Sequence, residues 1–209
     1  MFARTTTEGA GPVAQDGIGW LLEPYVVDCV TFARGIGPGE LVARLGARPA
    51  GPVRLATAVE ALDALAAPGV GSVARVGRAA GWSFAVEYGD AVGPTPDGLA
   101  AVSHRGVDAV NFLLTPWHPP SVFRHYEDGR HICSFGIGAE THRLGSDPDL
   151  LVPALTALAV LPGPRWSDGA RRERSHRLTM LAVQDHFGLR LPRHDVVEGR
   201  LPLHLVRER

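Results

Sequence analysis

Two stretches in the middle of the chain limit its fold most strongly. Ser72–Arg78 (SVARVGR) and Trp82–Tyr88 (WSFAVEY) have strand composition, and Ala79-Ala80-Gly81 between them suits a tight turn. Alternate residues of a strand share a face, so one face of the second stretch is apolar and the other carries Ser83, Ala85 and Glu87. The sequence therefore predicts an antiparallel hairpin with a core face and a solvated outer face.

Other segments extend this sheet. Tyr25–Gly35 and Val107–Leu114 have strand character, and a further hairpin spans His125–Gly138. Helix signals fall between and after the strands. They are Pro38 to Gly46, a capping box at Thr57 with Leu62 and Leu65 facing inward, Gly98 to Ser103, Asp147-Pro148 to about Leu161, and Ser167 to Gly188.

The order of these segments predicts an α+β fold. We expect an antiparallel sheet of about five to six strands in a meander, with helices packed mainly on one face. A flexible tail over residues 1–17 and a single α+β domain over residues 18–209 complete the predicted organisation.

Composition and charge exclude several classes of protein. The 209 residues are 45% hydrophobic and carry a net charge of −1, so no overall field attracts nucleic acid or an anionic membrane. All 21 basic residues are arginine, which suggests a GC-rich bacterial gene. Residues 1–19 lack the apolar core of a secretory signal, and Cys29 and Cys133 are best interpreted as two buried, reduced thiols on strands. We therefore expect a cytoplasmic protein.

Four motifs in order resemble those of one protein family. CVTFARG before a PxE helix start, GRAAGWSFAVE, EDG with SF, and GSDPDLL resemble a family of uncharacterised bacterial proteins from high-GC genomes, classed as a domain of unknown function. The resemblance covers roughly residues 20–190. It supports the fold and implies no catalytic residues; by analogy only, small families of this appearance serve as immunity or chaperone-like partners.

The segment HYEDGRHIC contains residues that metals bind, and its register decides their arrangement. If Asp128-Gly129 is a two-residue type I′ turn, Tyr126 faces His131, His125 faces Ile132, and the two histidines occupy opposite faces. A type I turn with a bulge at Gly129 would instead align His125, His131 and Cys133. We favour the first register and predict no metal and no cofactor.

The remaining chemical motifs are weak. Gly35–Glu40 (GIGPGE) follows a strand, but Glu40 replaces the last glycine of a dinucleotide loop and Pro38 lacks an amide donor. Glu87 could act as a general base, although a solvated glutamate is the usual case, and no spacing indicates a catalytic triad.

Arginines recur every third residue at Arg171, Arg174 and Arg177, near the start of the last predicted helix. Cations are unfavourable there, so these arginines are candidate partner-binding residues, and a solvated helix face is the competing interpretation. The leading hypothesis is a non-enzymatic cytoplasmic module that binds another protein, in an immunity- or chaperone-like role. The alternative is a small-molecule enzyme or ligand-binding protein that uses Glu87, His125 and His131.

Overall fold

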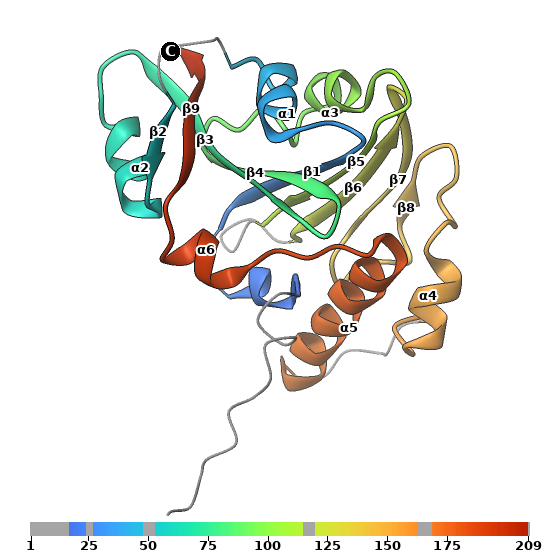
Figure 1. Cartoon of the computed structure of the whole chain (residues 1–209). Coiled ribbons are helices and arrows are strands. Elements are labelled where there is room, and N and C mark those ends of the chain that lie inside the picture. The colour runs from blue at the N-terminus through green and yellow to red at the C-terminus, as the bar shows by residue number, and fades with distance from the viewer. Residues whose placement is uncertain (1–16, 24–26, 48–52, 115–119, 163–168, 209) are drawn as a thin grey trace, which may run out of the picture.

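A single sheet connects most of the chain in the computed structural model (Figure 1). The structure describes residues 17–23, 27–47, 53–114, 120–162 and 169–208. The predicted tail, residues 1–17, lies outside these ranges except for Gly17. No helix within the described ranges is long and apolar enough to cross a membrane.

The sheet has nine strands within the described residues, in the order β2-β9-β3-β4-β1-β5-β6-β7-β8, and every neighbouring pair is antiparallel. The strands are β1 Cys29–Arg34, β2 Arg54–Ala56, β3 Val70–Ala79, β4 Trp82–Gly89, β5 Asp108–Leu113, β6 Val122–Glu127, β7 Arg130–Gly136, β8 Arg143–Leu144 and β9 Leu201–Glu208. The α+β class is confirmed, but the predicted count of five to six strands is wrong. The additional strands are β2 and β8, which are too short to show a period, and β9 at the C-terminal end.

The predicted hairpin of β3 and β4 is present. Ala80 and Gly81 both have positive φ angles, +47° and +83°, and Ala79 pairs directly with Trp82 across this two-residue turn. The meander is interrupted at two places, because β1 lies between β4 and β5, and β9 lies between β2 and β3.

The helices are η2 Gly19–Leu22, α1 Pro38–Arg44, α2 Ala58–Leu65, α3 Pro96–Ser103, α4 Val152–Ala157, α5 Gly169–Phe187 and α6 Arg193–Val197. Local signals define several of their ends. Thr57 and Glu60 form the predicted capping box, with Glu60 N–H donating to Thr57 Oγ1 at 3.2 Å and Thr57 N–H donating to Glu60 Oε2 at 2.7 Å. Gly188, at φ +67°, follows α5 as predicted.

Two sequence predictions about helices are wrong. Asp147 does not cap a helix, because residues 147–152 form turns. In these turns a backbone N–H donates to the carbonyl oxygen three residues earlier, and α4 begins only at Val152. Leu62 does not face inward, since 54% of it is exposed; the buried residue of α2 is Ala61. Leu65, the other residue predicted to face inward, is half-buried.

Helices cover both faces of the sheet, which corrects the prediction that they pack mainly on one. One hydrophobic core lies between the sheet and η2, α4, α5 and α6, and includes Trp82, Phe84 and Phe187. A second core, with Ala33, Ala85 and Ala109 on the strands, packs against α1 and α3. Figure 1 shows the sheet between these two groups of helices.

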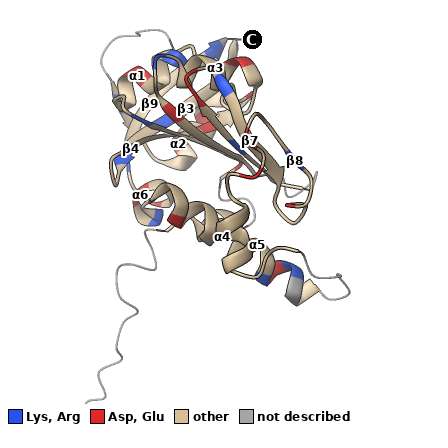
Figure 2. Ribbon diagram, turned by 90° about the vertical axis from the view of Figure 1, so that its right-hand side faces the viewer, with Lys and Arg blue, Asp and Glu red and all other residues tan. Residues whose placement is uncertain are grey.

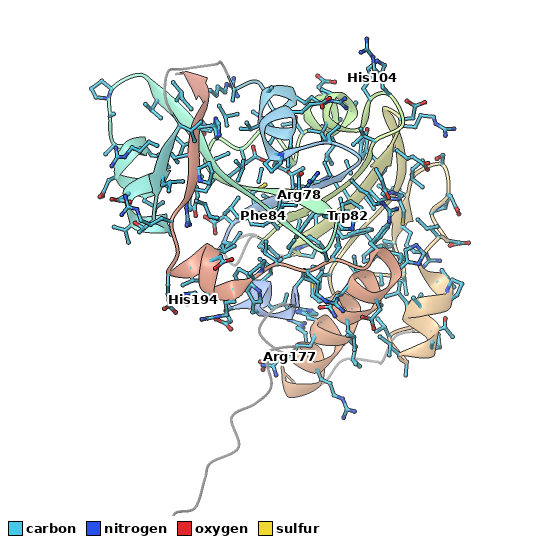
Figure 3. The ribbon with its side chains drawn as sticks, in the orientation of Figure 1. Arg78, Trp82, Phe84, His104, Arg177 and His194 are labelled. Atoms are coloured by element: carbon cyan, nitrogen blue, oxygen red, sulfur yellow. The ribbon has the colours of Figure 1, made fainter. Side chains whose placement is uncertain are left out.

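Three predictions about core residues are confirmed. Trp82 is buried, and Figure 3 shows it with Phe84 inside the molecule. Cys29 on β1 and Cys133 on β7 are both buried and form no disulfide.

Arg75 on β3 attaches the C-terminal segment to the sheet. Its guanidinium is fully buried and donates to the carbonyl oxygens of Ala56, Val196 and Gly199 at 2.7–2.9 Å. It also donates to Tyr88 Oη at 3.0 Å. All these acceptors are neutral, and Val196 lies at the end of α6, where the helix dipole is negative. Hydrogen bonds and this dipole therefore replace a carboxylate counter-ion.

Candidate functional site

The histidine hairpin adopts the two-residue turn that keeps its histidines apart. Asp128 and Gly129 have φ angles of +49° and +76°, and Tyr126 pairs with His131 across β6 and β7. The His131 ring stacks on Tyr126 with 5.0 Å between centroids. Because Tyr126 belongs to the core under α1 and α3, His131 lies on that face of the sheet.

His125 lies on the opposite face, although its strand partner differs from the prediction. The register shifts between the Tyr126–His131 and His125–Cys133 pairs, which leaves Ile132 as the extra residue of a bulge and places His125 opposite Cys133 rather than Ile132. The His125 ring packs against Phe187 of α5 at 4.8 Å between centroids. Among the described residues, no group of three His, Cys, Asp or Glu side chains has a geometry that could hold a metal ion.

His125 and Asp108 form an oriented pair beneath α5. His125 Nε2 lies 2.7 Å from Asp108 Oδ1, and Arg34 bonds the other carboxylate oxygen. Burial alone would raise the pKa of Asp108, but the contacts with His125 and Arg34 outweigh it and lower that pKa. Arg34 also lies over the Trp82 ring, 4.8 Å from its centroid.

The thiol opposite His125 is a poor nucleophile. Cys133 Sγ donates to the Pro148 carbonyl at 3.5 Å, and burial raises its pKa to about 11. The His125–Asp108 pair therefore has no activated nucleophile beside it among the described residues. Its contacts are those of a docking point for the C-terminal end of α5.

Glu87 is buried, which corrects the prediction that it lies on a solvated outer face. It accepts hydrogen bonds from the N–H groups of Val92, at 2.8 Å, and Gly93, at 3.1 Å to each oxygen. Thr31 Oγ1 and Cys29 Sγ also donate to it, at 3.2 and 3.6 Å. Burial raises the pKa of Glu87, and these hydrogen bonds offset only part of that rise.

These contacts fix the loop after β4 against the sheet. A Cβ at Gly93 would lie 2.1 Å from Thr31 Oγ1, so only glycine allows the loop backbone to approach this closely. Burial, followed by the charge of Glu87, raises the pKa of the Cys29 thiol well above its usual value. Glu87 is thus a loop anchor whose oxygen atoms are already occupied.

Polar side chains continue from Glu87 across the strands, and the sequence analysis missed them. Thr31 on β1 pairs with Asn111 on β5, and Asn111 pairs with Arg124 on β6. These three strands therefore each place one polar side chain next to the polar side chain of the neighbouring strand. We call Glu87, Thr31, Asn111 and Arg124 the polar row. Asn111 is fully buried and donates from Nδ2 to Val30 O at 3.2 Å and Thr31 Oγ1 at 3.0 Å. A polar residue at an inward position of an apolar strand, as in VNFLL, is the signal that could have identified the row.

The arginines of α5 lie on its surface. Arg174 and Arg177 are exposed, and Arg177 forms an ion pair with Glu173 at 2.6 Å. The side chain of Arg171 lies outside the described part of the chain. Figure 2 shows basic residues at this end of α5, and Figure 3 shows Arg177 projecting from the molecule.

A group of exposed apolar side chains is the second feature that the sequence analysis missed. Six large apolar residues are exposed within the described chain, and four of them fall on or beside β2 and on α2: Val53 (59%), Leu55 (51%), Val59 (67%) and Leu62 (54%). We call these four residues the α2–β2 surface. Arg200 connects its two parts, because its guanidinium donates to the Leu55 carbonyl at 2.9 Å and pairs with Glu60 at 3.1 Å.

The fold and these sites define an α+β protein built on a large antiparallel sheet. A family model described as a family of unknown function (DUF6461) matches residues 16–187, so the chain belongs to that family. This confirms the predicted resemblance to an uncharacterised domain. Comparisons with curated proteins and with solved structures found no match.

Proposed function

We propose that this protein is a non-enzymatic cytoplasmic module that binds another protein through the α2–β2 surface, in an immunity- or chaperone-like role. The observation that carries the proposal is the clustering of exposed apolar residues. Scattered surface leucines and valines are ordinary, but four of the six exposed in the described chain fall within ten residues, on one strand and its adjoining helix. Covering these residues with a partner would remove apolar surface from water.

The surface suits docking by side chains rather than addition of a strand. β2 is an edge strand of only three residues, and Arg200 occupies the Leu55 carbonyl. A charged side chain over a short edge is a common protection against strand pairing. The Arg200–Glu60 ion pair also supplies polar groups next to the apolar side chains, as interfaces commonly require.

The enzymatic alternative has less support from the contacts. Its three residues do not converge, since His125 and His131 lie on opposite faces and the oxygens of Glu87 are occupied by backbone and side-chain donors. Catalysis requires polar groups that meet at one accessible place.

The α5 arginines remain candidate partner-binding residues. Arg174 is exposed in the first half of α5, and no described carboxylate pairs with it. An acidic surface on the same partner would compensate this charge.

Photo-crosslinking in the cells that produce the protein tests the proposal. A benzoylphenylalanine at Val59 or at Leu62 should each give one adduct of the same mass. The control position is Leu144, which is 68% exposed on β8 and should give no such adduct. Leu55→Glu should abolish the adduct. The same adduct from all three positions, or none from Val59 and Leu62, would contradict the proposal.

A further inference from the structure

The outer side of α2 has the residue pattern of a buried helix face. The exposed positions of this helix and of the turn after it are 59, 62, 63, 66 and 67, which is the i, i+3, i+4, i+7, i+8 spacing of a single stripe. All but one of these residues are apolar: Val59, Leu62, Ala66 and Ala67. The other side, with Ala61 buried and Leu65 half-buried, packs on the sheet. α2 therefore has two apolar sides, and the described residues cover only one of them (Figure 1).

The stripe continues past the last residue of α2 because the chain keeps its helical turn. Ala66 has helical backbone angles, φ −72° and ψ −13°, and its N–H donates to Asp63 O at 3.1 Å. The Ala67 N–H donates to Ala64 O at 3.3 Å. The stripe from Val59 to Ala67 is therefore continuous over about 12 Å, at the helical rise of about 1.5 Å per residue.

Asp63 lies within this stripe, and no described cation pairs with it. The other carboxylate of α2, that of Glu60, pairs with Arg200 at 3.1 Å. A partner that covers the stripe takes water away from the Asp63 carboxylate, which is costly unless the partner supplies a positive charge. The apolar stripe therefore requires a cation at one defined place in whatever covers it.

We propose that the partner presents an amphipathic helix whose apolar stripe includes an arginine or lysine that pairs with Asp63. This inference rests on the proposed function and names the element that binds. A helix fits the stripe because the side-chain ridges of one helix pack into the grooves of another, and Ala66 and Ala67 allow a close approach. A partner strand would need a free backbone edge, but β2 has only three residues and Arg200 occupies the Leu55 carbonyl.

The positions of crosslinks on the partner test the helix. Benzoylphenylalanine at Val59 and at Ala66 stands about 10 Å apart along α2, a distance that a strand spans in about three residues and a helix in about seven. After crosslinking in the cells that produce the protein, mass spectrometry of the digested adducts locates the two sites. They should lie about seven residues apart in one segment of a partner helix aligned with α2, or about four apart in a helix that crosses it.

The substitution Asp63→Lys tests the ion pair. The position is exposed and lies in the C-terminal half of α2, where a cation suits the helix dipole, so α2 should keep its structure. The yield of the Val59 adduct should fall about tenfold or more. Asp147→Lys is the matched control and should leave the yield unchanged, because Asp147 is exposed and follows β8, at the opposite edge of the sheet from β2. Changing the partner's cation to glutamate should restore the adduct of Asp63→Lys.

This inference and the proposed function fail in different ways. No adduct from Val59 would contradict the proposed function and the inference together. An adduct whose two sites are about two or three residues apart or in separate segments would overturn the inference alone. An adduct yield that Asp63→Lys leaves unchanged, or crosslinks to this chain itself or to a second copy of it, would also overturn it.

Discussion

Trp82 joins the sheet to the end of α5 through several contacts of one side chain. Its indole N–H donates to the Phe187 carbonyl at 3.1 Å, and its ring meets the Phe187 ring edge-on at 6.4 Å. Trp82→Ala should therefore lower the free energy of unfolding by about 3–5 kcal/mol, measured by urea denaturation.

The control for Trp82 is Leu144→Ala. Leu144 is 68% exposed, so its loss should change the free energy of unfolding by no more than about 0.5 kcal/mol. Equal effects of the two substitutions would show that Trp82 does not support the core.

Glu87 should make unfolding depend on pH in a direction set by its burial. Its folded-state pKa is raised above the ordinary value of 4.5, so the folded chain holds a proton that the unfolded chain has lost. The stability that this bound proton contributes is fully present below the unfolded-state pKa of Glu87. It is lost as pH rises through the higher folded-state pKa. Glu87→Gln does not titrate, so it should gain stability relative to the wild type over that window.

Urea unfolding of the wild type and Glu87→Gln from acidic to neutral pH measures this difference. Titration of all other groups cancels between the two chains. A wild type that gains stability relative to the variant as pH rises would mean that the folded-state pKa of Glu87 is lowered, contrary to the account.

At the scale of elements, predictions succeeded where local chemistry decides the structure. The Thr57 capping box and the positive φ angles of Ala80-Gly81 and Asp128-Gly129 depend on a few adjacent residues. These sequence signals determine the backbone conformation of the same few residues that carry them, so they can be recognised from the local sequence. Asp147-Pro148 has the same local signature, yet the chain there forms turns, and Asp149 instead pairs with Arg143 at 2.7 Å.

The β6–β7 hairpin should bind no zinc. His125 and His131 lie on opposite sheet faces, so they cannot be ligands of one ion, and the part of the chain that the structure describes gives neither histidine the further ligands that a site needs. Elemental analysis of untagged protein should give sub-stoichiometric zinc that His125→Ala and His131→Ala leave unchanged. About one equivalent, lost in both variants, would reject this arrangement.

For the whole molecule, long-range pairing is what the sequence could not predict. β9 joins β3 from the far end of the chain, and α1 and α3 cover the face on which Glu87 lies. The alternation of apolar and polar residues along β4 correctly assigned its side chains to two faces. It did not show that both of these faces are buried. An antiparallel strand with one polar face is ordinarily interpreted as half exposed.

The candidate sites were hidden for the same reason. Asn111 and Arg124 are far apart in sequence from Glu87 and meet it only through the order of β4, β1, β5 and β6. The α2–β2 surface depends on side-chain exposure: Leu62 has the spacing of a buried helix residue, and only the packing of α2 shows that it is not.

The proposed function depends on the binding of another protein at the α2–β2 surface. The most direct measurement is the native mass of the protein in extracts of the cells that produce it, compared with the purified chain at the same concentration. Wild type should migrate as a complex in the extract and as a single chain when purified, and Leu62→Glu as a single chain in both. Leu144→Glu, the matched control, should keep the complex. A Leu62→Glu protein that keeps the complex, or a wild type that is a single chain in the extract, would contradict the claim.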